Sequence, residues 1–197
     1  MKKFNSTCIS IFIVGCFVVL PLSCSQSEYS RLVKTEMSKD VMKDSLLFGM
    51  KFGQSRQTFF DICWQLNNKG LIKQGPENKF VQYQLPHRKN DSTAKKVMMY
   101  FYGIFNEEKI MTGMDLKFGY NSWSLWNKSY QADTLLPQVK DSLLEWFPGN
   151  DFISVPLKKN GEAVLVKIDG NRRILIEPLE NNKDVNARID DLRYLIE

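Results

Sequence analysis

Side chains that commonly act as nucleophiles, general bases or metal ligands are sparse in this chain of 197 residues. His87 is the only histidine, and it falls in an expected turn with no cysteine or carboxylate cluster at metal-ligand spacing. The carboxylate pairs Glu107-Glu108 and Asp190-Asp191 fall in an expected hairpin turn and on an expected helix, where nothing in the sequence predicts burial. We therefore predict no catalytic residue, no metal site and no cofactor.

One segment has the composition of a binding surface. Two tryptophans and two tyrosines alternate with amides and hydroxyls over residues 120–130; they are Tyr120, Trp123, Trp126 and Tyr130. Aromatic rings in such a setting stack on sugar rings or anchor a protein partner. The alternative is that this segment crosses a sheet and buries its aromatic rings in the core. The binding hypothesis requires Trp123 and Trp126 to be at least partly exposed.

The overall charge excludes one class of partner. Without the first 23 residues the chain carries 25 basic and 22 acidic side chains, so it is close to neutral for its size. The basic residues occur in short separate runs, whereas a nucleic-acid groove needs a continuous basic stripe with interleaved aromatic rings. We therefore predict no nucleic-acid partner.

The N-terminus has the pattern of an export signal. Lys2 and Lys3 precede a mostly apolar run of about 14 residues, Ile9 to Leu22, which is long enough for a signal peptide. It is shorter than the roughly 20 residues that a membrane-spanning helix needs. Residues 1–23 are therefore predicted to be a removable signal rather than a permanent membrane helix.

The end of that signal resembles the lipobox of bacterial lipoproteins. A small residue is followed directly by cysteine in Leu22-Ser23-Cys24, which implies that Cys24 is acylated and becomes the first residue of the mature chain. Several acyl chains hold a protein on a membrane far more firmly than one chain does. Pro21 departs from the lipobox, which usually has an aliphatic residue at that position, so ordinary secretion is the alternative.

Cysteine usage agrees with an exported protein. Cys8 and Cys16 lie in the expected signal and Cys24 is the expected anchor, so only Cys63 remains for the fold and no internal disulfide can form. Cys63 lies on an apolar helical face and is interpreted as a small core residue rather than a nucleophile.

The elements expected from periodicity form two similar units. Residues 24–45 are predicted to be a lipidated tether, with a short helix over 29–42 as the alternative, and residues 46–197 a single domain. In the first unit we expect a short strand over 47–53, then an amphipathic helix carrying Phe59, Ile62, Cys63 and Leu66 that ends at Gly70, then strands over 80–85, 97–105 and 110–118. In the second we expect a helix from Thr134 to Phe147, strands over 152–157, 163–168 and 173–179, and a closing helix over 185–196.

This order predicts an α+β fold. Two units of a helix plus three strands, about 46–118 and 133–197, would fuse around one antiparallel sheet with the helices on one face and a C-terminal helix. Each unit alone is close to the lower size limit for an independent core, which favours one fused domain.

Two resemblances bear on function. The segment Phe48 to Leu71, with Gly53-Gln54-Ser55 before its helix, resembles the opening unit of small envelope lipoproteins of β-lactamase-inhibitor-like architecture, which implies a protein-binding role. As a whole the chain resembles Bacteroides-type cell-envelope lipoproteins, since Asp44-Ser45-Leu46 and Asp91-Ser92-Thr93 look like their O-glycosylation acceptor.

Taken together, the sequence predicts a non-enzymatic lipoprotein of the bacterial cell envelope. Ser25 after the cysteine resembles the pattern of lipoproteins sent to the outer membrane. The expected partners are the membrane, through the lipid anchor, and an envelope protein or glycan. The alternative is an enzyme whose site is assembled from scattered polar residues.

The anchor gives the first test. Metabolic labelling of the producing bacterium with a fatty-acid probe should mark the wild-type protein and should fail to mark Cys24→Ala, because that thiol is the predicted acylation site. Cys63→Ala is the matched control and should label normally. Equal labelling of wild type and Cys24→Ala would contradict the anchor.

Overall fold

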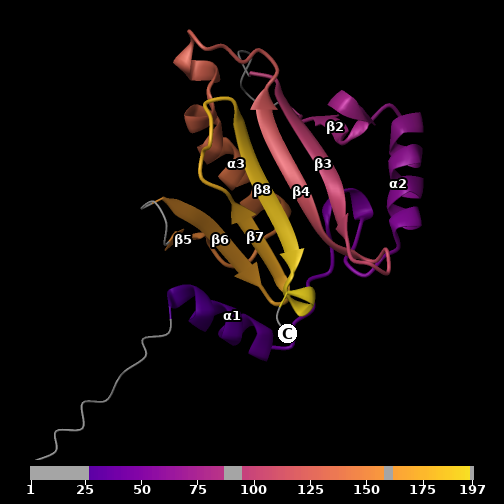
Figure 1. Ribbon diagram of the computed structural model, residues 1–197, viewed down its shortest axis with the longest axis vertical. Coiled ribbons are helices and arrows are strands. Elements are labelled where there is room, and N and C mark those ends of the chain that lie inside the picture. The colour runs from indigo at the N-terminus through magenta and orange to yellow at the C-terminus, as the bar shows by residue number, and fades with distance from the viewer. Residues whose placement is uncertain (1–26, 87–94, 158–161, 196–197) are drawn as a thin grey trace, which may run out of the picture.

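The protein is an α+β domain built on one antiparallel sheet of eight strands (Figure 1). The computed structural model describes residues 27–86, 95–157 and 162–195. Within these residues the fold class predicted from the sequence is confirmed. The helices are α1 (Glu28–Ser38), α2 (Arg56–Asn68) and α3 (Ala132–Trp146), and the strands are β1 (Lys73–Gln74), β2 (Val81–Gln84), β3 (Val97–Phe105), β4 (Met111–Tyr120), β5 (Ile153–Pro156), β6 (Ala163–Asp169), β7 (Arg172–Ile176) and β8 (Asp184–Asp191).

The sheet consists of two meanders joined side by side. Its strand order is β1-β2-β3-β4-β8-β7-β6-β5, so β4 and β8, the last strands of the two meanders, form the central pair. Their register runs from Gly113 opposite Asp190 to Gly119 opposite Asp184. Each meander follows one helix, α2 or α3, so each unit contains four strands after its helix rather than the three expected.

The predicted C-terminal helix is wrong. Residues 184–191 form β8, and the 3-10 turn Leu192–Tyr194 follows it. The apolar residues of β8 occur at every second position and face the core, whereas their polar neighbours face the other way. Val185, Ile189 and Leu192 are also spaced as on one face of a helix, which is why the sequence predicted a helix here. The alternation at every second residue is the pattern of a strand with one face on the core.

The predicted strand over residues 47–53 is also wrong. Leu47–Gly49 form a 3-10 turn in which Phe48 adopts a φ of 57°, and Gly53 follows with a φ of 79°. Met50 and Phe52 are nevertheless buried in the core. The positive φ angles of Phe48, Gly49 and Gly53 are incompatible with a strand.

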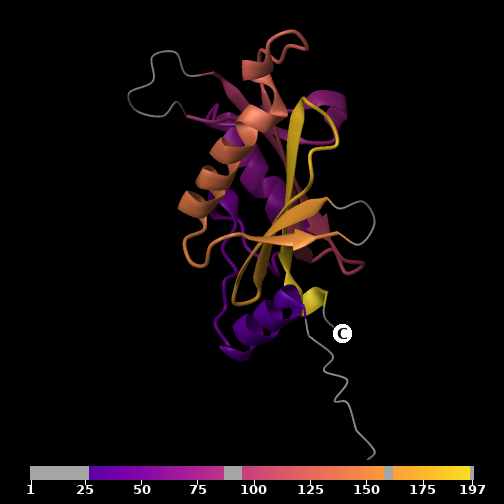
Figure 2. The same cartoon turned by 90° about the vertical axis from the view of Figure 1, so that its left-hand side faces the viewer.

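The main core lies between one face of the sheet and the two helices α2 and α3, and Figure 2 shows α3 on that side of β8. Phe101, Leu116 and Phe118 alternate onto this face and are almost completely buried. α2 flanks the part of β3 that extends beyond β2, since Phe59 contacts Tyr102 and Phe105 with ring centroids 5.4 Å and 5.6 Å away. None of the helices in the described ranges is long and apolar enough to cross a bilayer.

Helix α1 replaces most of the expected tether. Ser27 caps it, because its hydroxyl accepts a hydrogen bond from the backbone N–H of Ser30 at 3.2 Å. Its apolar side chains pack on β6, on the sheet face opposite α2 and α3, against Val166 and Ile168. The expectation of all helices on one face therefore holds for α2 and α3 but not for α1, which corresponds to the alternative of a short helix.

A buried carboxylate fastens α1 to the domain. Glu36, 5% exposed, accepts hydrogen bonds from the backbone N–H of Gly170 at 3.1 Å, from Asn150 at 2.8 Å and from Lys39 at 2.6 Å. Burial raises the pKa of Glu36, but these hydrogen bonds outweigh it and hold the pKa below its ordinary value. Gly170 has a φ of 56°, and a Cβ there would lie 2.0 Å from the carbonyl oxygen of Val41, so only glycine fits.

Removing this carboxylate should loosen α1. Glu36→Ala leaves the Gly170 N–H without its acceptor and removes one of the two acceptors of the Asn150 amide, which costs about 1–3 kcal/mol. Hydrogen exchange at the α1 amides should become roughly tenfold faster or more at neutral pH. Lys34→Ala, at an exposed position on the same helix, is the control.

The pH dependence has a definite sign. Because the pKa of Glu36 is lowered in the folded protein, its stabilisation is present above the unfolded pKa and is lost as the pH falls through the folded pKa. The difference between wild type and Glu36→Ala should therefore shrink in acid. Equal exchange rates at neutral pH would show that Glu36 does not hold α1.

Candidate functional site

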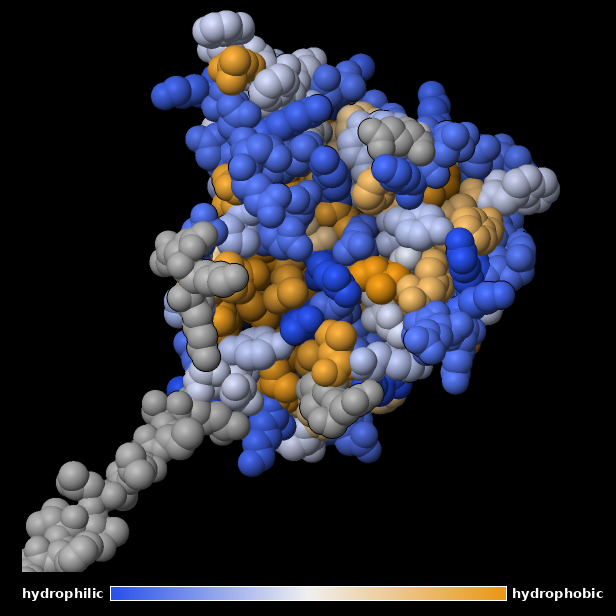
Figure 3. All heavy atoms as spheres, viewed as in Figure 1, coloured by the Kyte–Doolittle hydropathy of each residue, from blue (hydrophilic) through white to orange (hydrophobic). Residues whose placement is uncertain are grey.

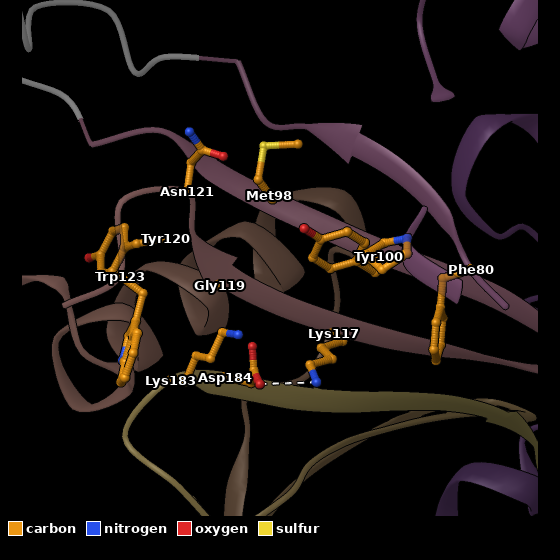
Figure 4. Close-up of a pocket in the computed structure, with 11 residues that line it drawn as sticks. Phe80, Met98, Tyr100, Lys117, Gly119, Tyr120, Asn121, Trp123, Lys183 and Asp184 are labelled. Atoms are coloured by element: carbon orange, nitrogen blue, oxygen red, sulfur yellow. Dashed lines mark ion pairs between the residues drawn. The ribbon is translucent and has the colours of Figure 1, made fainter. Parts of the chain in front are cut away.

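The sheet face opposite α2 and α3, called the open face below, contains a concave site near the end of β4. We name this site the cup; its volume is about 520 Å³. Figure 4 shows Trp123 and Phe80 at opposite ends of the cup, with Tyr100 and Lys117 between them. The residues that line it are Pro76, Phe80, Met98, Tyr100, Lys117, Gly119, Tyr120, Asn121, Trp123, Lys183 and Asp184.

Strand register places the polar and aromatic side chains of the cup. Tyr100 on β3 lies opposite Lys117 on β4, and Met98 lies opposite Gly119, which in turn pairs with Asp184 on β8. Residues two apart on a strand share a face, so all five positions lie on the open face. Gly119 has no side chain, so the floor of the cup is open at this position. A Cβ there would lie 3.1 Å from Asp184 Oδ1.

Trp123 forms one wall of the cup and is held in place. Its indole Nε1–H donates to the carbonyl oxygen of Asn182 at 3.0 Å, and its backbone N–H donates to the carbonyl oxygen of Tyr120 at 3.2 Å. The ammonium of Lys183 lies 5.8 Å from the centroid of the indole ring. Trp123 is half-buried, so its ring is positioned but still reachable from solvent.

The cup has a small excess of positive charge. Lys117 Nζ pairs with Asp184 Oδ2 at 3.0 Å, and Asp184 is buried. Lys183 has no carboxylate partner among the residues that the structure describes. The ammonium of Lys117 is partly exposed, so it can contact a ligand while Asp184 stays buried beside it.

The structure separates the four aromatic residues singled out in the sequence. Trp123 lines the cup, and Tyr120 borders the cup but is buried in the main core, as the alternative had it. Tyr130 packs edge-on against Tyr120 with ring centroids 5.7 Å apart, and the ammonium of Lys95 lies 4.7 Å from the Tyr130 ring. Trp126 is 91% exposed and is not among the residues that line the cup. The exposure that the binding hypothesis required of Trp123 and Trp126 is therefore met.

Most of the cup was not foreseen from the sequence. The expected strand over 97–105 contributes Met98 and Tyr100 to the cup, and nothing in its apolar run singles out these two side chains as part of a site. Asp184 was missed because β8 was taken for a helix. The alternation of polar and apolar residues over 184–190 was the pattern that could have identified β8 as a strand. Cys24 and His87 lie outside the described residues.

The two carboxylate pairs weighed from the sequence do not form a reactive centre. Glu107 and Glu108 are exposed in the turn between β3 and β4. Asp190 is buried and pairs with Arg173 and Arg188, each at 2.7 Å. Asp191 is completely buried and accepts from Asn171 at 3.1 Å and from Arg193.

One carboxyl on the open face has a perturbed acidity. Desolvation raises the pKa of Asp115, which Arg188 opposes and Asp190 reinforces. No lining residue of the cup is Asp115, so this carboxyl lies outside the site described above. Among the described residues no group of three or more His, Cys, Asp or Glu side chains could hold a metal ion.

Comparison of the chain with protein-family models, with curated proteins and with solved structures gave no match.

Cys63 provides a test of how the thiol is placed. It lies on α2, is half-buried, and burial raises its pKa to about 11. Because the thiolate is the reactive form, iodoacetamide should alkylate Cys63 in folded Cys24→Ala protein at pH 8 at least about tenfold more slowly than in the urea-unfolded protein. The folded rate should increase as the pH approaches the raised pKa. A folded rate at pH 8 equal to the unfolded one would contradict this placement.

Proposed function

We propose that the protein is a non-enzymatic lipoprotein, anchored through Cys24 in the bacterial cell envelope at the outer membrane, that binds an envelope glycan in the cup. The signal-like N-terminus and the lipobox-like Leu22-Ser23-Cys24 support the anchor. The binding role rests on the side chains that line the cup.

The observation that carries the glycan assignment is the pairing of fixed rings with hydrogen-bonding groups. Trp123, Tyr100 and Phe80 offer faces on which the apolar side of a sugar ring can stack. Lys117, Lys183, Asp184 and Asn121 offer donors and acceptors for hydroxyl groups within the same cup. A volume near 520 Å³ falls within the range of small-ligand sites, about 300–1,000 Å³.

The small size of the cup favours a glycan over a protein as its occupant. A stable protein interface covers about 800 Å² on each partner, which is a broader surface than one small concavity provides. A protein contact finds more support next to the cup, where Trp126 and Leu125 are 91% and 55% exposed. This adjacent surface is the second candidate.

An enzyme remains the alternative from another class, and Asp115 is the residue that supports it best. Its raised pKa is the kind of perturbation found at acid–base sites. The buried carboxylates Asp190 and Asp191 are already paired with arginines, so neither of these two is free to act with Asp115. Asp115→Asn is therefore expected to leave glycan binding unchanged.

The docking of α1 supports a short distance between the cup domain and the membrane. The described chain begins at Ser27, which caps α1, three residues after the proposed anchor Cys24. Three extended residues reach at most about 10 Å. An anchored domain would therefore be held close to the membrane surface rather than at the end of a long tether.

Trp123 and Trp126 form a matched pair for the test. A glycan array of bacterial envelope oligosaccharides would find a ligand, and isothermal titration would give its affinity. Trp123→Ala removes a wall of the cup and should weaken binding at least about tenfold. Trp126→Ala removes a ring outside the cup and should change the affinity by less than about twofold.

Unfolding midpoints of both variants check that the fold is intact. The glycan assignment would be abandoned if the array showed no ligand, or if Trp126→Ala weakened binding more than Trp123→Ala did.

A further inference from the structure

A second concavity lies on the open face, over β5, β6 and β7. We name it the groove; its volume is about 490 Å³. In Figure 3 apolar side chains gather in a hollow on this part of the molecule, beside hydrophilic side chains toward the centre of the face. The residues that line the groove are Tyr29, Val155, Leu157, Val164, Val166, Arg173, Leu175, Glu177, Pro178 and Glu180.

The chemistry of the groove suits an aliphatic chain. Its apolar side chains are valine, leucine and proline, with Tyr29 as the single aromatic residue. Leu157 is 41% exposed, so apolar surface is left in contact with solvent, and covering it would be favourable. This lining differs from that of the cup, where aromatic rings alternate with polar groups.

The charges at the groove disfavour a free fatty acid. The guanidinium of Arg173 donates to Asp190 at 2.7 Å and to the hydroxyl of Tyr29 at 2.7 Å, so it is already neutralised. Glu177 and Glu180 are exposed at the rim. They would repel a carboxylate but can accept hydrogen bonds from hydroxyl groups.

The groove and the cup are neighbours on the same face. Lys117 of the cup lies opposite Asn186 of β8, and the carbonyl oxygen of Asn186 accepts a hydrogen bond from the backbone N–H of Glu177 at the groove. Lys117 and Glu177 are thus two strand spacings apart, which is about 10 Å. One ligand can therefore reach both sites.

We infer that the protein binds a glycolipid, with an acyl chain in the groove and the sugar head group in the cup. The head-group site rests on the proposed function, whereas the groove stands on its own lining. Such a ligand matches the aliphatic groove, the hydroxyl acceptors Glu177 and Glu180, and the aromatic cup in one molecule.

The position of α1 fits this ligand class. Tyr29 lines the groove and lies in the first turn of α1, five residues after the proposed lipidation site at Cys24. Five extended residues span at most about 18 Å. The anchor would therefore hold the groove next to a bilayer, which is where glycolipids are found.

Two probes that share a sugar test the inference. Isothermal titration of the purified Cys24→Ala protein should show that dodecyl β-maltoside, below its micelle concentration, binds at least about tenfold more tightly than methyl β-maltoside. Dodecanoate should bind more weakly than dodecyl β-maltoside, because it carries a carboxylate and lacks the head group.

Variants then assign the gain to the groove. Leu157→Gln makes the groove more polar and Val164→Phe fills it. Each variant should reduce the tenfold difference in affinity between dodecyl β-maltoside and methyl β-maltoside, and the affinity for methyl β-maltoside should stay unchanged. Leu71→Gln, at an exposed leucine outside the groove, is the matched control. Trp123→Ala should weaken the binding of both maltosides.

The inference is overturned if both maltosides bind equally, if neither binds, or if the gain persists in both groove variants. It is also overturned if dodecanoate binds as tightly as dodecyl β-maltoside, since the groove would then be a site for any aliphatic chain. The glycan array tests the proposed function separately, so a failure of the acyl site and a failure of the cup can be told apart.

Discussion

The antiparallel pairing of β4 with β8 is the interaction on which the rest of the molecule depends. It joins two meanders that are far apart in sequence, and its register sets both faces of the sheet at once. On one face Phe118 and Val185 meet in the core beneath α3. On the other face the same two strands bring Lys117 to Asp184 and so build the polar side of the cup. A shift of one residue in this register would expose the core residues and dismantle the cup together.

A second constraint is the β6–β7 hairpin, which organises the end of the molecule near the N-terminus. Lys167 is completely buried and is compensated by Asp169 at 2.7 Å and by the carbonyl oxygen of Asn150. Gly170 at the hairpin tip holds Glu36 of α1. Buried charges of this kind are tolerated only when each has a partner, and Lys167 and Glu36 both have one. The groove next to Tyr29 is a consequence of that docking, because α1 covers only part of the apolar face of β5 to β7.

Local patterns predicted much of the fold. The helix around Phe59 and Cys63, the two long strands of the first unit and the α+β class follow from strong periodicity and are found in the structure. The errors occur where two patterns compete. In β8 a few apolar residues at helical spacing hid a two-residue alternation, and at Phe48 a positive φ replaced an expected strand. The cup could be predicted only in part, through Tyr120 and Trp123, because its other walls come from strands whose neighbours are set by long-range register rather than by local sequence.

The proposed ligand site is the cup, on the open face of the sheet. The most direct measurement is a nuclear magnetic resonance titration of the isotope-labelled Cys24→Ala protein with the oligosaccharide that binds best on the array. The largest shifts should fall on the Trp123 indole N–H and on the backbone amides of Gly119 and Lys183, because these groups lie in the cup. Shifts centred on α2 and α3, on the opposite face of the sheet, would contradict it.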